Sequence, residues 1–288
     1  MLEPALYIVA TPIGNLADIT RRATEVLEAA DIVAAEDTRH TGQLLGSLGI
    51  SAKLLAYHEH SPEAAAQRLV EAIGAGQAVA LVSDAGTPTI SDPGYRLVRS
   101  VQDAGHAVVP IPGACAAIAA LSGSGLPSDR FNFAGFLPSR RAARRQRIAT
   151  IAGADATQIL YEAPHRLREA LEDLVEGFGA DREAVLAREL TKRFETLRRD
   201  TLSGLLRWVE EDDNQSRGEL VLLLAPAPER PAALPDETLL ALLEDLADLV
   251  PGRKAAKLLA RHSQYSSREL YDVLLSRRDR ATSGKEVP

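Results

Sequence analysis

The sequence predicts two α/β domains followed by a small helical domain. Over the first 226 residues, short apolar runs rich in β-branched residues alternate with longer amphipathic segments, as strands alternate with helices. A proline-rich stretch at residues 225–231 then separates three further helical patterns from the rest. We therefore predict domains at residues 1–127, 128–226 and 233–288, with a linker at residues 227–232.

The first domain is predicted to hold a mainly parallel sheet. Its strands are apolar throughout rather than alternating, which is typical of a sheet covered on both faces. Asp92 and Pro93 are expected to form the N-cap and first residue of one helix. The predicted strands are residues 6–10, 32–35, 78–83 and 107–111, and the helices include residues 62–75 and 91–104.

The second domain repeats this alternation with shorter connections, so a mixed sheet is predicted there. The predicted strands are residues 131–138, 157–161, 184–187 and 219–224, and the helices are residues 140–152, 165–178 and 201–209.

The C-terminal helices are predicted at residues 236–249, 253–262 and 267–275. Asp236 and Ser266 are the predicted N-caps, and Glu269 would complete a capping box with Ser266.

The composition excludes several classes of protein. The single cysteine excludes an internal disulfide framework, and the six histidines lack the H-x-x-x-H spacing, so no metal site is expected. No signal peptide and no apolar segment of about 20 residues is present, so we expect a cytoplasmic protein without a membrane partner.

Two basic segments stand out from the net charge of −7. Residues 140–147 contain five arginines and no acid, and residues 251–280 contain eight Lys or Arg against three acids. Such patches can hold RNA, because phosphate contacts are local, but they are also typical of solvated helix faces. The candidate RNA contacts are Arg140, Arg141, Arg144, Arg253, Lys257 and Arg261, the last three forming one stripe on a helix.

Four unusual segments each follow a predicted strand of the first domain, where open α/β sheets bind ligands. The densest, residues 82–94, has two glycines, two prolines and two aspartates, which indicates a shaped ligand loop. Residues 10–16 and 109–120 add glycine–proline turns, and small residues from Ala114 onward leave a helix N-terminus open to a ligand. Cys115 is more typical of a packing residue than of a nucleophile, since no histidine is placed to activate it.

The fourth segment contains Glu36, Asp37 and Arg39. Two carboxylates beside an arginine suit either polarisation of a substrate or an internal ion pair with a capped helix start, and both readings stay open. Polar triplets also follow two strands of the second domain, at residues 161–166 and 187–192, where they would close a cleft from the opposite side.

Together, these six segments resemble the tetrapyrrole methylase superfamily, and most closely its branch that acts on ribosomal RNA. The resemblance runs in order over residues 5–225, and the C-terminal helices resemble the small tail domain of that branch. It implies a class III methyltransferase with an interdomain cofactor cleft. It further implies a homodimer that uses S-adenosyl-L-methionine, and no metal, to methylate a cytidine 2′-hydroxyl in 16S ribosomal RNA of the small ribosomal subunit.

The resemblance also implies the site. The cofactor would contact Pro12, Gly14, Ser83, Asp84, Ala85, Gly86, Thr87, Pro88, Pro112, Gly113, Ala114, Ala116, Tyr161, Ala163, Ala187, Arg188, Glu189 and Leu190. Independently of the resemblance, we predict Glu36, Asp37, Arg39 and Lys192 as the catalytic set, with the first three on the substrate side and Arg39 on a phosphate. Asp37, His58, Lys192 and Glu195 stay open as the base that takes the hydroxyl proton.

Three alternatives to an RNA methyltransferase of this family stay open. A small-molecule methylase of the porphyrin-precursor type would share the fold without needing the basic tail. A non-catalytic RNA-binding assembly factor would lack cofactor binding, and a knotted RNA methyltransferase would show a trefoil in its backbone.

Overall fold

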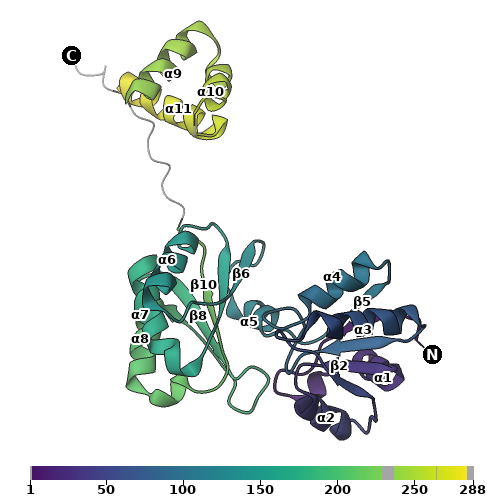
Figure 1. Cartoon of the computed structure of the whole chain (residues 1–288). Coiled ribbons are helices and arrows are strands. Elements are labelled where there is room, and N and C mark those ends of the chain that lie inside the picture. The colour runs from purple at the N-terminus through teal and green to yellow at the C-terminus, as the bar shows by residue number, and fades with distance from the viewer. Residues whose placement is uncertain (1, 229–236, 264, 284–288) are drawn as a thin grey trace. The chain divides into compact units, whose positions relative to one another are not determined.

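The computed structural model describes residues 2–228, 237–263 and 265–283, and the chain divides into two compact units, Met1–Pro226 and Ala227–Pro288 (Figure 1). Within its described residues the first unit holds two five-stranded sheets with helices packed on them. This confirms the predicted fold class of two α/β sheets followed by C-terminal helices.

The first sheet is parallel throughout, in the strand order β3-β2-β4-β1-β5. Parallel strands need crossover helices, and these cover both faces of the sheet. One face packs against α1 and α2 around Leu27 and Leu45, and the other against α3 and α4 around Leu69 and Leu97. The strands are Leu6–Val9 (β1), Ile32–Ala35 (β2), Leu54–Ala56 (β3), Val79–Val82 (β4) and Val108–Ile111 (β5); the helices are Arg21–Ala29 (α1), Thr38–Ser47 (α2), Glu63–Gly74 (α3) and Tyr95–Asp103 (α4), with a short 3₁₀ turn at Leu16–Asp18.

The second sheet is mixed, as predicted, in the order β6-β7-β10-β8-β9. β6 is parallel to β7, whereas β10 runs antiparallel to both of its neighbours and β9 runs antiparallel to β8. The strands are Phe131–Phe136 (β6), Thr157–Glu162 (β7), Glu183–Arg188 (β8), Thr196–Thr201 (β9) and Leu220–Leu224 (β10); the helices are Arg141–Ile151 (α6), Leu167–Phe178 (α7) and Leu202–Glu211 (α8), with 3₁₀ turns at Pro164–Arg166 and Asp213–Ser216.

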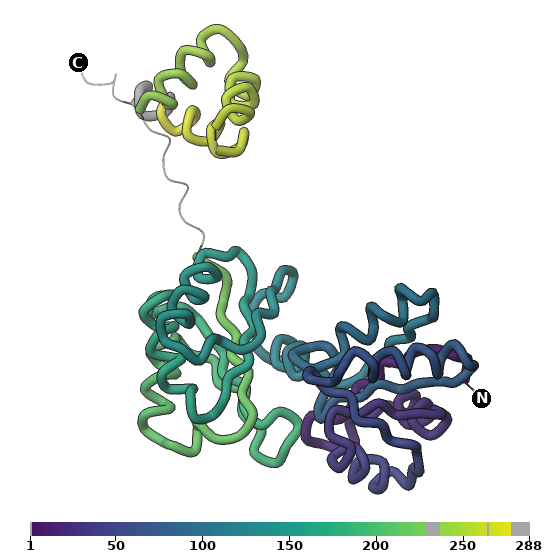
Figure 2. The backbone as a smooth tube through the Cα atoms, viewed as in Figure 1, coloured from purple at the N-terminus to yellow at the C-terminus, as the bar shows by residue number. Residues whose placement is uncertain are grey.

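The two faces of the second sheet are covered by different parts of the chain. Helices α6, α7 and α8 cover one face, where Trp208 of α8 packs against the core and beneath the guanidinium of Arg198, 5.1 Å from its ring. The helix α5 (Ala116–Ser124), which follows the last strand of the first sheet, packs its Ala120 and Leu121 on the other face. Figures 1 and 2 show α5 at the junction of the two sheet regions, so this helix ties them together.

Helix α6 is held to α7 by an ion-pair network centred on Asp173. Its carboxylate, which is fully buried, accepts hydrogen bonds from Arg141 (3.0 Å), Arg144 (2.7 Å) and Arg145 (2.9 Å). The Arg144 side chain is only 1% exposed and also pairs with Glu169. Arg144 therefore serves the interior of the fold, and its expected contact with RNA is corrected on that ground.

The described part of the C-terminal unit contains the helices Glu237–Leu249 (α9), Gly252–Ala260 (α10) and Ser267–Ser283 (α11) around a core that includes Leu243, Leu259 and Leu270. The capping box is confirmed: Ser266 N–H donates to the Glu269 carboxylate at 2.6 Å and Glu269 N–H donates to Ser266 Oγ at 3.2 Å. The N-cap predicted at Asp236 lies outside the described residues. None of the helices in the described ranges has the length and apolar character that crossing a membrane requires.

The predicted start of the helix at residues 91–104 is wrong. Helix α4 begins at Tyr95, and its N-cap is Gly94 with φ +133°, not Asp92. A Cβ at position 94 would lie 2.7 Å from Leu81 Cδ2, so the chain passes too close to β4 for a side chain there. Asp92 is thereby left in the loop, free to face the site described next.

Candidate functional site

Three loops that follow neighbouring strands of the first sheet are joined into one wall. Thr11, after β1, and Gly86, after β4, exchange backbone hydrogen bonds of 2.9 and 3.1 Å. The Thr87 hydroxyl donates to the carbonyl oxygen of Ala114, after β5, at 2.9 Å. Gly113 packs on the end of β1, where a Cβ would lie 2.7 Å from the Cβ of Ala10. Gly86 and Gly113 thus allow the loops to pack closely on one another, and this packing fixes the shape of the wall.

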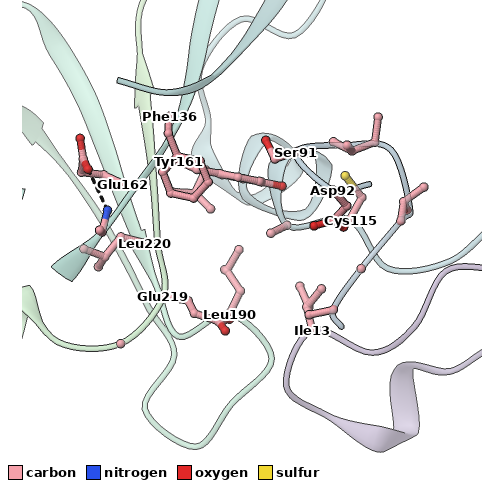
Figure 3. Close-up of a pocket in the computed structure, with 18 of the residues that line it drawn as sticks. Ile13, Ser91, Asp92, Cys115, Phe136, Tyr161, Glu162, Leu190, Glu219 and Leu220 are labelled. Atoms are coloured by element: carbon pink, nitrogen blue, oxygen red, sulfur yellow. Dashed lines mark hydrogen bonds between the residues drawn. The ribbon is translucent and has the colours of Figure 1, made fainter. Parts of the chain in front are cut away.

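A cavity of about 550 Å³ lies between this wall and the second sheet. Its volume falls within the range of small-molecule and cofactor sites, and most of its lining is apolar with a few polar groups. Figure 3 shows Ile13, Asp92 and Cys115 facing Tyr161, Leu190 and Leu220 across it. The lining residues are Ile13, Ala85, Gly86, Thr87, Ile90, Ser91, Asp92, Cys115, Ala116, Phe136, Tyr161, Glu162, Ala163, Pro164, Leu190, Gly218, Glu219, Leu220 and Val221.

Tyr161 bridges the two sides of the cavity. It stands at the end of β7, and its hydroxyl oxygen accepts the backbone N–H of Ala117 in the first turn of α5 at 3.1 Å. The rings of Phe133 and Phe136 pack edge-on against it, with centroids 4.9 and 5.7 Å away. Burial raises the pKa of the Tyr161 hydroxyl, so the group stays neutral and available for hydrogen bonding.

Asp92 is the most perturbed carboxyl of the cavity. Burial raises its pKa to about 6, and the nearby carboxylates of Glu36 and Asp84 add to the rise. Burial also raises the pKa of Glu36, whose carboxylate accepts the N–H of Asp84 at 3.4 Å. A carboxylate in an apolar cavity beside other acids is stabilised by a cationic ligand.

A second, smaller cavity of about 360 Å³ adjoins the first, because Ile13, Ala85 and Glu219 line both. Its lining includes residues of helix α2 and of the loop between β8 and β9. Its lining residues are Pro12, Ile13, Gly14, Leu16, His40, Gln43, Leu44, Ser47, Asp84, Ala85, Lys192 and Glu219.

The predicted cofactor residues divide among three places. The large cavity is lined by Ala85, Gly86, Thr87, Ala116, Tyr161, Ala163 and Leu190, and the small one by Pro12, Gly14, Asp84 and Ala85. The remaining predicted residues, which line neither cavity, are Ser83, Pro88, Pro112, Gly113, Ala114, Ala187, Arg188 and Glu189. Of these, Arg188 donates to the carbonyl of Asn214 and Glu189 accepts from the N–H of Glu219, so both support the wall of the second sheet.

Among the four predicted catalytic residues, Lys192 lines the small cavity together with Asp84, and Asp84 is hydrogen-bonded to Glu36 and to the N–H of Asp37. Asp37 is the N-cap of α2: its carboxylate accepts the N–H of Arg39 at 2.8 Å and pairs with the Arg39 guanidinium at 3.2 Å. The hydrogen bonds to Arg39 lower the pKa of Asp37. Lys192 alone of the four lines a cavity, and the Arg39 side chain is 89% exposed. The structure thus shows the ion pair and the capped helix start, and the polarisation of a substrate by this segment stays a prediction.

Several lining residues were not predicted from the sequence. Phe136 ends β6, Glu219 directly precedes β10, and Leu220 and Val221 begin it. The first residues of β10 reach the cavity because this strand runs antiparallel to β7 and β8. The signal in the sequence was the glycine at position 218, just before β10. Gly218 has φ +85°, and a Cβ there would overlap the Glu189 carboxylate.

Comparison with known proteins adds family evidence. The family model of the tetrapyrrole (corrin/porphyrin) methylases matches residues 5–206. A protein of Vibrio cholerae named ribosomal RNA small subunit methyltransferase I is 52% identical over 93% of this chain and 93% of its own length. Relatives of the same name in Escherichia coli O157:H7 and Pseudomonas aeruginosa are 52% and 50% identical, covering 94% and 98% of this chain and 94% and 100% of theirs.

Solved structures agree on the fold. Uroporphyrin-III-C-methyltransferase from Thermus thermophilus has a TM-score of 0.54 at 22% identity and covers 77% of this chain and 94% of its own. A diphthine synthase has a TM-score of 0.56 at 18% identity and covers 76% and 89%.

Proposed function

The chain belongs to the tetrapyrrole methylase family, and from that premise we propose that it transfers a methyl group from S-adenosyl-L-methionine to the RNA of the small ribosomal subunit. The names of relatives that are about 50% identical over nearly the whole chain support this acceptor. More finely, we propose the 2′-hydroxyl of a cytidine in 16S ribosomal RNA as the acceptor group. We also propose that the enzyme acts as a homodimer in the cytoplasm, where ribosomal RNA is found.

One observation carries the proposal: a largely apolar cavity of about 550 Å³ is bounded by loops of both sheets. The cofactor is a sulfonium cation, and it supplies an activated methyl group when bound. The residues present fit such a cation, because Asp92 and Glu219 offer carboxylates and Phe136 and Tyr161 offer aromatic rings in one lining. The small residues Ala85, Gly86 and Ala163 leave space in the cavity for the cofactor.

The chain's own contribution is alignment and exclusion of water. Methyl transfer to a hydroxyl is an in-line displacement, so holding the two reactants in line provides much of the rate enhancement. Asp37, with its lowered pKa, is a weak base. Burial alone would lower the pKa of Lys192, but hydrogen bonds to Glu189 and Glu219 outweigh it and raise the pKa, so Lys192 stays protonated. We therefore propose electrostatic positioning roles for both, with Arg39 contacting an RNA phosphate.

The C-terminal unit is the proposed RNA-contacting part. Arg253, Lys257 and Arg261 are exposed on one side of α10, whose opposite side packs Ala255, Ala256 and Leu259 into the core. Exposed cations that pair with no carboxylate of the described residues are the groups that neutralise phosphates.

The test combines cofactor binding with methyl transfer. We expect calorimetric titration with S-adenosyl-L-methionine to show one site, and labelled methyl groups to enter small ribosomal subunits. Ala163→Trp, which fills the cavity, should weaken cofactor binding roughly tenfold or more, since overfilling a packed site costs about 1–3 kcal/mol. Ala64→Trp, on the exposed side of α3, is the matched control and should bind normally.

Wild-type protein that binds the cofactor but methylates no ribosomal RNA would contradict the proposed acceptor. Equal cofactor binding by wild type and Ala163→Trp would show that the cavity is not the site.

A further inference from the structure

The small cavity has a fixed cation at its edge. The stem of Lys192 packs on Gly14, where a Cβ would lie 2.5 Å from the lysine Cγ. Its ammonium group donates to Glu189 at 2.9 Å and pairs with Glu219 at 3.1 Å. Lys192 thereby joins the loop after β1 to the loop between β8 and β9, and it holds that second loop beside the cavity.

The loop between β8 and β9 is held in an uncommon conformation. Glu189 and Thr191 have φ of +51° and +66°, a left-handed region that costs free energy for residues other than glycine. Hydrogen bonds across the loop compensate: Lys192 N–H donates to the Glu189 carbonyl at 3.0 Å and Glu195 N–H to the Lys192 carbonyl at 3.1 Å. The Thr191 N–H also donates to the Glu195 carboxylate.

This ordered loop presents a large aromatic side chain to solvent. Phe194, two residues after Lys192, is 65% exposed. The guanidinium of Arg193 lies over its ring, 5.5 Å from the centroid, and makes no ion pair with any carboxylate in the described ranges. An exposed ring of this size has no role in the core of the unit, and a flat ring beside a cation is the combination that proteins use to stack unpaired RNA bases.

We propose that Phe194 stacks on an unpaired base of the RNA substrate next to the nucleotide that enters the small cavity, with Arg193 on the adjoining phosphate. The proposal rests on the proposed function, because it assumes an RNA acceptor. It assigns residues 192–194 to substrate recognition, whereas Leu190 of the same loop lines the proposed cofactor cavity. RNA is favoured over a protein partner because the Arg193 guanidinium beside the ring pairs with no carboxylate of the described residues. In addition, the shared lining of the two cavities leads from this loop to the proposed methyl-donor site.

The experiment measures binding of naked small-subunit ribosomal RNA separately from methyl transfer. Phe194→Ala should weaken RNA binding roughly tenfold to a hundredfold, the range found for loss of one stacked base. Phe194→Tyr, which keeps the flat ring, should bind as wild type, whereas Phe194→Leu, which keeps only apolar bulk, should behave like Phe194→Ala. Cofactor affinity should be unchanged in all three variants.

Tyr95→Ala is the matched control, since Tyr95 is 66% exposed on α4 and lines neither cavity. It should bind RNA as wild type. Normal RNA binding by Phe194→Leu would overturn the proposal, as would a change in oligomeric state in Phe194→Ala with unchanged RNA affinity. If wild type binds this RNA but transfers no methyl group, the proposed function fails while the binding series still decides the role of Phe194.

Discussion

Two basic segments look alike in the sequence but differ in the structure. In α6, three of the five neighbouring arginines converge on the buried carboxylate of Asp173, and Arg144 is itself buried. In α10, Arg253, Lys257 and Arg261 are exposed, and no acidic side chain of the described residues pairs with them. The first segment is internally neutralised, and the second keeps its charge for a partner.

The difference shows that a local charge count does not predict an interface. The acid that neutralises α6 lies about 30 residues further along the chain, on α7, so no window around the arginines reveals it. Arg253 of α10 instead lies against an aromatic ring, that of Tyr271 on α11, 5.4 Å from the guanidinium, and this contact leaves the positive charge unneutralised.

The largest expected effect is on the α6 network. Asp173→Ala should lower the free energy of unfolding by about 3–5 kcal/mol, because it leaves the buried guanidinium of Arg144 without its partner. Denaturant unfolding measures this. Glu176→Ala, at the solvent side of the same network, is the control and should cost well under half as much.

The same network predicts acid sensitivity. Burial would raise the pKa of Asp173, but three arginine hydrogen bonds outweigh it and lower the pKa below the usual value. Its contribution is therefore present above the ordinary carboxyl pKa of about 4 and is lost as the pH falls through the lower native pKa. The stability difference between wild type and Asp173→Ala should shrink in this range. A difference that is constant down to pH 2 would contradict the assignment.

An intermediate effect is expected on α10. Replacing Arg253, Lys257 and Arg261 together by Gln should weaken RNA binding and reduce the slope of log affinity against log salt by about 2, since each phosphate contact on single strands contributes about 0.7. Stability should change little. An unchanged salt slope would leave only a solvated helix face.

The smallest effect is expected from the outward arginines of α6. Arg140→Gln with Arg147→Gln should change stability by no more than about 0.5 kcal/mol, as is usual for exposed positions. Their effect on RNA affinity should be smaller than that of the α10 variant. An equal loss in both variants would remove the distinction between the two segments.

Much of the fold could be predicted, because buried strands and caps have local signals. The strands of the first sheet other than β3 are continuous apolar runs, and the Ser266–Glu269 capping box has a fixed spacing. The strands β3 and β9 were not predicted. Both lie at sheet edges, and β9 (Thr196–Thr201) carries two arginines and an aspartate, so it lacks the apolar pattern of a buried strand.

The candidate site could be predicted in part, for a related reason. Loops that follow parallel strands meet at one edge of the sheet, and Ala85, Gly86, Thr87 and Ala116, which were predicted on this ground, line one cavity. The start of β10 and the position of Asp92 could not be predicted in this way. The first depends on an antiparallel pairing, and the second on the close approach of Gly94 to Leu81.

The single tryptophan makes the two halves of the first unit optically distinct. Trp208 packs beside the core that α6, α7 and α8 form with the second sheet, while the helices and strands of the first sheet contain none. Its emission therefore reports on one half, whereas far-ultraviolet circular dichroism reports on both. If α5 couples the halves tightly, the two signals will change at the same denaturant concentration; a lag between them would measure how independently each half opens.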